Sequence, residues 1–565
     1  MTDTLTGELI NLLIVAVIDA ALLSWIALWW YRRSVIAITS TRATPAASSA
    51  SSLSPLPPAP AVTAGAFPLE VKRPVNAATT EVDPDDVSAS RRRIAVAYTL
   101  GALAFAATVT IAKFVEEPTL TPAAVLALLW VYAWPVWPAL AVLLASNRRQ
   151  WITLLVRYLL VGLGSVALLT LVTQALRGAI DTAAISNVGR SVAILLITAS
   201  IPLALVSLTG IRRVRAVMPL ALAATLLFGL GMLLFRRVIT QAFNNSFMRS
   251  ALLAAASWST TDVAFYSLYL FLALPVGWLA WRALRGLAAG YGRKRYSDIQ
   301  LVVDCWFLIV AMEATVTQLV IPFGLVGIPI GAAAFVFYRV TVAIVFWAWA
   351  LPARPADRTS RLLLLRVFGY QARTESLFDQ LARRWRFYGP VQLIAGTDLA
   401  MRTADPGDVL SFVEGRLRDL YVTSVDDIEA RIGGLDMTRD GDGRFRVNEV
   451  YCLNDTWKPM LQALLSVTDL VVMDLRSFSQ HNSGCRFELE QLVQNLRSDR
   501  LVLICDGSTD QALLRQILDE AMQRTGGPRA APSASLVHVE KGSPTEIRLV
   551  MECLLAPARG AVTAA

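Results

Sequence analysis

Long apolar runs fill much of the first 350 positions of this 565-residue chain. About 20 consecutive apolar residues suffice for an α-helix to cross the hydrocarbon core of a bilayer. Hydrophobic residues make up 55% of the chain and charged residues only 17%, whereas soluble domains are about one quarter charged. The runs therefore predict a polytopic α-helical membrane bundle with about nine spans. These are expected near residues 9–30, 94–113, 122–145, 151–175, 191–210, 216–235, 263–282, 299–321 and 328–350.

Basic residues cluster at alternate ends of these runs, as they do in cytoplasmic loops. The clusters are Arg32/Arg33, residues 91–93, Arg148/Arg149, residues 212–215, residues 293–295 and Arg354/Arg358. Acidic residues such as Glu8 and Glu116 fall on the other side, while Arg177 and Arg236/Arg237 break the pattern. We expect a multi-pass protein of the cell inner (plasma) membrane whose chain is cytoplasmic after about residue 351. The expected partner is the lipid bilayer. Because the basic clusters that flank the apolar runs account for the net charge of +9, no nucleic-acid partner is expected.

The segment before the main bundle divides into two parts. Residues 1–31 are expected to be a transmembrane anchor and not a signal peptide, because the segment starts with acidic residues and has no small-residue cleavage site. Residues 32–93 are rich in Pro, Ala and Ser, a composition that cannot bury a core, so we expect a disordered linker. The bundle itself is expected to occupy residues 94–350.

Three ionisable residues lie inside the last two expected spans: Asp304, Glu313 and Arg339. A charge within a bilayer costs several kcal/mol unless it is paired. We expect Asp304 near a membrane interface and Arg339 paired with Glu313, holding the last two helices together. The alternative is that these groups line a transport pathway, which would make the protein a transporter or channel with a cytoplasmic regulatory domain.

Short apolar runs alternate with amphipathic segments from residue 361 onward. This pattern is typical of an α/β domain with a mainly parallel sheet, expected here over residues 355–560. Strands are predicted at residues 361–368, 391–396, 444–452, 469–475, 500–506 and 535–540. Helices are predicted at residues 374–390, 407–420, 456–465, 483–497, 510–523 and 544–555.

Residues 438–449 resemble a calcium-binding loop, with Asp440, Asp442 and Glu449 at ligand positions. However, Thr438 stands where the first ligand should be, and a strand follows where an EF-hand needs a helix. We therefore interpret this segment as a turn before a strand and expect no metal site.

Glu488 lies in the helix predicted after the fourth of these strands. It falls about 80° from the centre of the apolar stripe formed by Cys485, Leu489 and Leu492, at 100° per residue. In an open α/β sheet, ligands bind beyond the carboxyl ends of the strands, where the loop before this helix must lie. Periodicity alone nevertheless favours a solvated helix acid.

Three segments, residues 366–381, 455–479 and "GCRFELEQL" (484–492), resemble parts of a Toll/interleukin receptor (TIR) domain. The resemblance implies a flavodoxin/TIR-like sheet and places Glu488 at the catalytic glutamate of TIR enzymes that hydrolyse NAD. "NSGCRFE" (482–488) is also similar to the "DSGTAFE" of nucleoside 2-deoxyribosyltransferases, a related fold whose nucleophile again corresponds to Glu488. The resemblance further implies that Phe368, Gly369 and Tyr370 line the site, that Arg476 meets phosphate, and that Asn482 and Ser483 contact substrate.

One departure from these families bears on the substrate. Asn482 stands where the deoxyribosyltransferases have an acid that protonates the leaving base, and Asn cannot deliver a proton. Nicotinamide leaves NAD as an already cationic group, so its release needs no acid. The resemblance thus implies NAD as substrate and no separate cofactor. Each residue also has a structural interpretation: Phe368 in the core, Gly369 in a turn and Arg476 paired with Asp474.

Three functions stay open from the sequence. The first is a membrane protein that presents a TIR-like domain for signalling or self-association and binds a nucleotide or other small molecule. The second is an NAD glycohydrolase or related N-glycosidase that uses Glu488. The third is the transporter or channel described above.

Overall fold

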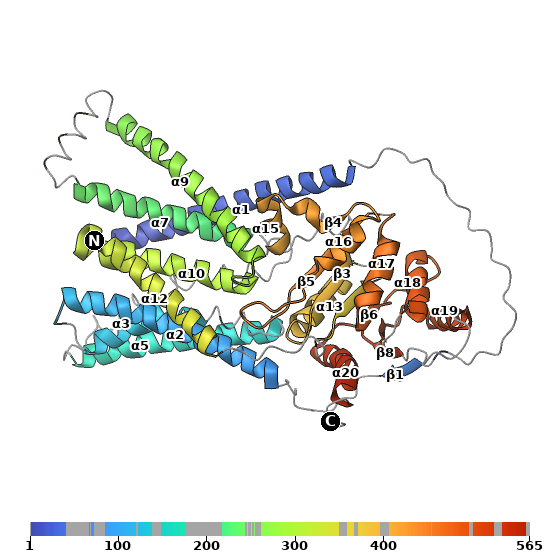
Figure 1. Ribbon diagram of the computed structural model, residues 1–565. Coiled ribbons are helices and arrows are strands. Elements are labelled where there is room, and N and C mark those ends of the chain that lie inside the picture. Colours follow the sequence, from blue (N-terminus) through green and yellow to red (C-terminus); the bar gives the residue numbers. More distant parts are fainter. Residues whose placement is uncertain are drawn as a thin grey trace. The chain divides into compact units, whose positions relative to one another are not determined.

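The structure of the protein is a computed structural model (Figure 1). It describes residues 2–40, 67, 69–72, 85–119, 122–137, 140, 148–176, 217–242, 246, 250, 254, 261–349, 359–366, 371–395, 406–453, 455–495, 501–524 and 534–560.

The chain forms two compact units. The helical unit consists of Met1–Arg32, Ser88–Leu351 and Thr403–Arg416, and the α/β unit consists of Arg33–Val87, Pro352–Arg402 and Leu417–Ala565. Neither unit is continuous in sequence. The α/β unit includes much of the segment before the bundle, and the helical unit includes part of the predicted 407–420 helical region.

The helical unit is built from long apolar helices. Its principal helices are α1 (Thr2–Ser40), α2 (Asp85–Glu116), α3 (Pro122–Ala133), α5 (Arg148–Leu176), α7 (Met218–Ala242), α9 (Thr261–Gly292), α10 (Asp298–Ala314) and α12 (Gly327–Ala348). In the described part of the chain, four helical segments are long and apolar enough to cross a membrane: Asn11–Thr39, Ser88–Glu116, Met218–Arg236 and Gln300–Ala348. The last contains two expected spans, whereas the expected span at 191–210 lies outside the described residues. The structure supports a membrane protein, and the expected count of nine is not confirmed.

Helices α10 and α12 are joined by a short irregular stretch. It comprises the π-helix η1 (Thr315–Leu319), α11 (Val320–Phe323) and the 3₁₀-helix η2 (Gly324–Val326). Gly324 has a φ of 60°, a left-handed conformation that glycine adopts without strain. A Cβ at Gly331 would collide with the Thr315 side chain. The helices therefore approach closely at this connection.

The charged residues of this hairpin pair differently from expectation. Arg339 forms an ion pair with Asp304, and the Tyr338 hydroxyl donates a 3.0 Å hydrogen bond to the same carboxylate. Glu313 instead accepts a 3.1 Å hydrogen bond from Thr317, so the predicted Arg339–Glu313 pair is wrong. Residues equidistant from the turn of a hairpin lie at the same level. Because Thr315 faces Gly331, Arg339 lies level with about residue 307, which is one turn from Asp304 but about 9 Å along the axis from Glu313.

The α/β unit is built on an eight-stranded sheet. The strands are β1 (Leu69–Lys72), β2 (Leu362–Arg366), β3 (Val391–Ala395), β4 (Tyr421–Val422), β5 (Val447–Cys452), β6 (Leu470–Asp474), β7 (Leu501–Cys505) and β8 (Ala534–His538). Their order is β1-β8-β7-β6-β2-β3-β5-β4, and every neighbouring pair is parallel. The predicted parallel sheet and its six predicted strands are confirmed.

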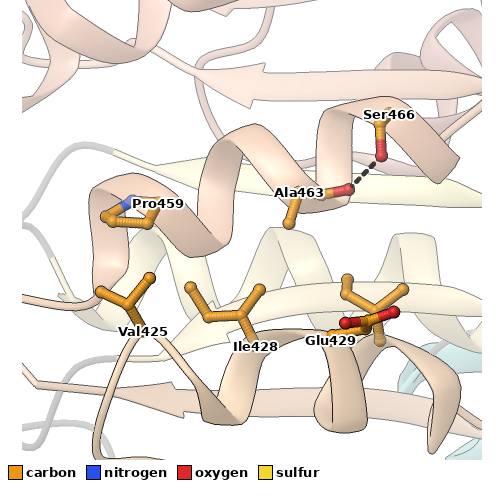
Figure 2. Close-up of a pocket in the computed structure, with 7 residues that line it drawn as sticks. Val425, Ile428, Glu429, Pro459, Ala463 and Ser466 are labelled. Carbon is orange, nitrogen blue, oxygen red and sulfur yellow. Dashed lines mark hydrogen bonds between the residues drawn. The ribbon is translucent and has the colours of Figure 1, made fainter.

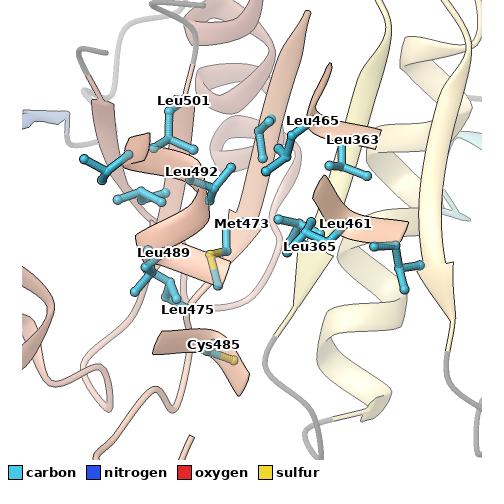
Figure 3. Packing of buried hydrophobic residues seen from close by; sticks show 14 of the residues in the cluster. Leu363, Leu365, Leu461, Leu465, Met473, Leu475, Cys485, Leu489, Leu492 and Leu501 are labelled. Carbon is cyan, nitrogen blue, oxygen red and sulfur yellow. The ribbon is translucent and has the colours of Figure 1, made fainter. Parts of the chain in front are cut away.

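Helices cover both faces of this sheet, which is why its strands are apolar on both sides. Leu363 and Leu365 pack on one face with α16 (Asp427–Gly433), α17 (Trp457–Val467), α18 (Ser483–Asn495) and α19 (Gln511–Arg524) (Figure 3). Leu362 and Leu364 point to the other face, where they pack with α13 (Gln371–Trp385) and α20 (Pro544–Gly560). The alternation follows from the two-residue period of a strand.

The strand order places a topological switch point between β2 and β6. Numbered along the chain, the central strands β5, β3, β2, β6, β7 and β8 read 3-2-1-4-5-6, the order of doubly wound dinucleotide-binding sheets. The expected flavodoxin-like order, 2-1-3-4-5, lacks the strand that β5 adds beyond β3. Chain connections diverge after β2 and β6, and ligands bind at this crevice in open α/β sheets.

The edge strand β1 comes from the segment expected to be a disordered linker. Leu69 to Lys72 pair in parallel with residues 534–537 of β8. Phe67 is buried on the face of the sheet that α16, α17, α18 and α19 cover. Its backbone N–H donates a 2.8 Å hydrogen bond to Asp519 on α19. The stretch 32–93 therefore contains an ordered strand, and most of residues 41–84 lie outside the described part of the chain.

Candidate functional site

The candidate site lies where β2 and β6 end. Arg366, the last residue of β2, is the register partner of Asp474, the last residue of β6. The chain after β6 leads into α18, which carries Glu488. The chain after β2 contains Phe368, Gly369 and Tyr370, which lie outside the described residues.

The loop before α18 fixes the start of this helix. The side-chain oxygen of Asn482 accepts hydrogen bonds from the backbone N–H of Ser479 (2.9 Å) and from its hydroxyl (3.2 Å). The helix begins at Ser483, and the N–H of Arg486 donates to the Asn482 carbonyl (3.1 Å). Asn482 and Ser483, the two residues expected to contact substrate, thus shape the loop and the first turn of α18.

Cys485 places this first turn against the end of β2. Its thiol lies 3.9 Å from the Arg366 carbonyl oxygen, and the side chain is buried. Figure 3 shows Cys485 at the end of α18 near Leu475, the residue that follows β6. Glu488 follows Cys485 by one helical turn and therefore lies on the same side of α18.

The Glu488 side chain is buried, contrary to the solvated acid that periodicity favours. The residue is 3% exposed, and among the described residues no group hydrogen-bonds to its Oε2 atom. Helix α18 is flanked by α17 and α19, so the edges of its apolar stripe are covered as well as its centre. Burial raises the pKa of Glu488 to about 8, although the positive charge of Arg366 acts to lower it.

Arg366 is the second buried ionisable group of the site. It is 5% exposed, and its Nε atom has no hydrogen-bond partner among the residues described. The two side chains do not form an ion pair in the described structure, but Cys485, one helical turn before Glu488, lies against the Arg366 backbone. The sequence prediction missed Arg366. The available signal was a charged residue at the end of the run "LLLLR".

Arg476 is engaged by a carboxylate of its own strand end. Its Nε and Nη2 atoms lie 2.8 Å and 2.7 Å from the two oxygens of Asp474, and both residues are buried. This is the ion pair that the structural interpretation of Arg476 predicted. A role in phosphate binding stays a prediction.

Asp506, beyond the end of β7, shows how a structural acid at this edge of the sheet is stabilised. Its Oδ1 accepts hydrogen bonds from the Ser508 N–H (3.0 Å) and the Thr509 hydroxyl (3.3 Å). Burial raises the pKa of Asp506, but hydrogen bonds from these residues outweigh burial and lower it. Ser508 also accepts a 3.1 Å hydrogen bond from the N–H of Ser477, which has a φ of 64°. Glu488 lacks such donors among the described residues.

A separate surface groove of about 430 Å³ lies between α16 and α17 (Figure 2). Its lining is mainly apolar: Val425, Ile428, Glu429, Ile432, Pro459, Ala463 and Ser466. The Ser466 hydroxyl donates to the Ala463 carbonyl of its own helix (2.7 Å). Neither Glu488 nor Arg366 lines this groove, so it is distinct from the candidate site.

The calcium-loop-like segment forms a turn before β5, as predicted. Arg439 and Phe445 form an antiparallel bridge, and β5 begins at Val447. The Asp442 carboxylate pairs with Arg444 at 2.5 Å, and that of Asp440 pairs with Arg446 at 2.9 Å. In the part of the chain that the structure describes, no cluster of three or more His, Cys, Asp or Glu residues suited to a metal ion is present.

The geometry places one buried carboxyl group, Glu488, and one buried guanidinium group, Arg366, at the switch point. Comparisons with known proteins add no relative: no protein-family model, curated protein or solved structure matches the chain significantly.

Proposed function

We propose that this membrane protein binds a nucleotide at the β2/β6 switch point of its α/β unit and cleaves the N-glycosidic bond of NAD there with Glu488. The observation that carries the proposal is the buried Glu488 carboxyl, one of whose oxygens has no hydrogen-bond partner among the described residues, one helical turn from the Cys485 thiol that lies against the buried Arg366. We further propose that the α/β unit faces the cytoplasm, where NAD is available.

The energetics favour a ligand site over a structural role. A buried polar atom without a hydrogen bond destabilises a fold by about 1–3 kcal/mol. Asp506 avoids this cost through its donors, and Asp474 avoids it through Arg476. Glu488 and Arg366 each keep an unpartnered atom among the described residues. Groups of this kind, beside the carboxyl ends of parallel strands, are typical of binding and catalytic sites.

The two charges suit the two ends of a nicotinamide nucleotide. Arg366 is suited to an anionic phosphate, and Glu488 is suited to the ribosyl carbon that bears the cationic nicotinamide. With a pKa of about 8, Glu488 carries a proton in the empty site at neutral pH. A cationic ring nearby favours the carboxylate, so substrate binding releases this proton.

The chemistry then follows from charge. As the bond between the ribosyl carbon and the nicotinamide nitrogen breaks, its electron pair leaves with nicotinamide, which becomes neutral. The Glu488 carboxylate stabilises or attacks the resulting oxocarbenium centre. Water adds its oxygen to this carbon and releases a proton, so the products are nicotinamide, ADP-ribose and one proton. Asn482 is not required to protonate the leaving group.

The direct test is nicotinamide release by the full-length protein in lipid nanodiscs supplied with NAD. Glu488→Gln keeps the shape of the side chain but cannot become a carboxylate, so release should fall at least about a hundredfold. Glu490→Gln is the matched control, because Glu490 lies on the same helix but pairs with Arg486 and Arg524. Equal release by the wild type and Glu488→Gln contradicts catalysis by Glu488. Binding of NAD without release leaves a nucleotide-binding signalling module.

A further inference from the structure

A nine-residue helix, α15 (Pro406–Glu414), lies between β3 and β4 in sequence but belongs to the helical unit. In a doubly wound fold, the helix of such a crossover normally packs on the sheet. Here the chain leaves the α/β unit after Arg402 and returns at Leu417. The helix of the crossover between β3 and β4 therefore belongs to the helical unit and not to the α/β unit.

Both ends of α15 are sharply defined. Pro406 occupies its first position, where a missing N–H costs nothing. Gly415, with a φ of 82°, ends the helix. The N–H of Gly415 donates to the Phe412 carbonyl (3.0 Å) and that of Arg416 to the Ser411 carbonyl (2.8 Å), the pattern of a Schellman motif. The helix thus has fixed ends at which the flanking chain is attached.

Apolar side chains hold α15 within the helical unit. Leu410 is 2% exposed and packs with Ala288 of α9 and Leu301 of α10. The Phe412 ring meets the Tyr31 ring of α1 edge to face, with centroids 5.9 Å apart. Figure 1 shows α15 beside α9 and α1. The helix therefore contacts three elements of the helical unit.

The chain on either side of α15 connects to the sheet at the carboxyl ends of its strands, where the candidate site lies. Strand β3 pairs with β2, which ends at Arg366, so the chain leaves β3 at the edge where Arg366 lies. On the return, Tyr421 and Val422 of β4 pair with Tyr451 and Cys452, the last two residues of β5. The chain therefore runs from the carboxyl end of β3 through α15 to the carboxyl end of β5.

We propose that α15 is the coupling element through which the helical unit controls the Glu488 site. A displacement of α1, α9 or α10 moves α15, and the described connection through η4 (Leu417–Leu420) carries the movement to β4 and so to the carboxyl end of β5, whose neighbour is β3. By reciprocity, a ligand that orders this edge of the sheet changes how firmly α15 is held. The mechanical link between α15 and the strand ends does not depend on the proposed function, whereas its effect on catalysis rests on the function proposed above.

Hydrogen–deuterium exchange on the full-length protein in nanodiscs tests the link without any ligand. Leu410→Ala and the milder Phe412→Leu loosen α15, and Arg418→Ala, an exposed position after α15, is the control. We expect amide exchange in β3 and β4 to rise at least about fivefold in both variants while β7 stays unchanged. A rise confined to α15 and the neighbouring ends of α9 and α10 overturns the proposal. If Leu410→Ala unfolds the protein, which a rise in β7 reveals, Phe412→Leu alone decides.

A second arm separates this proposal from the proposed function. The variant Tyr31→Cys with Phe412→Cys, joined by a bifunctional thiol cross-linker that spans the space of the two rings, locks α15 to α1. In the cross-linked protein, exchange in β3 and β4 should fall below that of the same variant without cross-linker, whether or not NAD binds. Altered exchange without NAD turnover upholds the coupling and rejects the enzyme. NAD turnover with unaltered exchange upholds the enzyme and rejects the coupling.

Discussion

Arg366 and Asp474 are register partners at the ends of neighbouring strands, yet the Asp474 carboxylate binds Arg476 through both oxygens. The Nε of Arg366 is consequently left without a hydrogen bond among the described residues. The Arg476 side chain, two residues beyond the end of β6, thus keeps the Asp474 carboxylate away from Arg366. We regard this arrangement as the reason that a buried guanidinium is available beside Glu488.

The Asp474–Arg476 pair should be costly to break on one side only. Arg476→Met leaves a buried carboxylate without its partner, a change that typically costs about 3–5 kcal/mol. The combined change Asp474→Asn with Arg476→Met removes both charges and should recover part of the loss. Thermal unfolding of the purified protein measures both. Equal midpoints for Arg476→Met and the wild type would show that Asp474 finds another partner, for which its register partner Arg366 is the candidate.

Glu488 should make the α/β unit less stable as the pH rises. Its pKa is about 8 in the folded protein and near the ordinary value of 4.5 in the unfolded chain. Between these values the folded state holds a proton that the unfolded state lacks, so the free energy of unfolding falls with increasing pH. The slope is about 1.4 kcal/mol per pH unit for one group and disappears above pH 8 and below pH 4.5.

Denaturation curves at several pH values test this. Glu488→Gln should show a smaller loss of stability than the wild type between pH 5 and about 8, because the amide does not ionise. Parallel pH profiles for the two proteins would mean that the carboxyl is not desolvated in solution. Glu490→Gln should follow the wild type.

Proton release on ligand binding is a separate consequence of the same group. At pH 7 the empty site holds a proton on Glu488, and a cationic nicotinamide nucleotide should displace up to one proton per molecule bound. Isothermal titration in two buffers with different ionisation enthalpies measures this number, using a non-hydrolysable NAD analogue. Glu488→Gln should bring it close to zero. An unchanged number would place the nucleotide away from Glu488.

The edge strand β1 should contribute to the stability of the α/β unit. Phe67→Ala removes a buried ring and is expected to cost about 3 kcal/mol. Val71→Ala, four residues on in the same edge segment, is the control because Val71 is 49% exposed. The rate of limited proteolysis in the chain after residue 67 is the measurement, and it should rise for Phe67→Ala but not for Val71→Ala. A fragment that starts at residue 355 lacks β1 altogether, and its bare β8 edge should promote aggregation.

The Asp304–Arg339 pair gives a test of the hairpin register. Arg339→Gln and Asp304→Asn should each lower the thermal stability of the full-length protein, and the double variant should be closer to the wild type, because each single change leaves one charge unpaired. Combining Arg339→Gln with Glu313→Gln should give no such recovery. Recovery of thermal stability in the variant that combines Arg339→Gln with Glu313→Gln would instead support the Arg339–Glu313 pair expected from the sequence.

The α/β unit was largely predictable because its strands are buried on both faces. Runs such as "LLLLR" and "LVVMD" stand out against polar loops, and their spacing predicts a parallel sheet. Strand β1, with sequence LEVK, lacks this signal because an edge strand is only half covered. The two-residue β4 is too short for any periodicity to appear.

The candidate site was predictable only in part. Motif resemblance selected Glu488, but its burial depends on α17 and α19, which helical periodicity within α18 cannot report. The partner of Arg339 depends on the position of the turn between α10 and α12, to within one helical turn. Assignment of α15 to the helical unit depends on contacts with α1 and α9, which are distant in sequence.

The position of β1 has a consequence for how the protein is made. The hydrogen bond from Phe67 to Asp519 joins residues 452 positions apart, so β1 leaves the ribosome long before its partner strand exists. Contacts of such high sequence separation form late. The sheet therefore receives its last strand only when synthesis is nearly complete, and chains terminated early are left with an open edge that quality-control proteases can recognise.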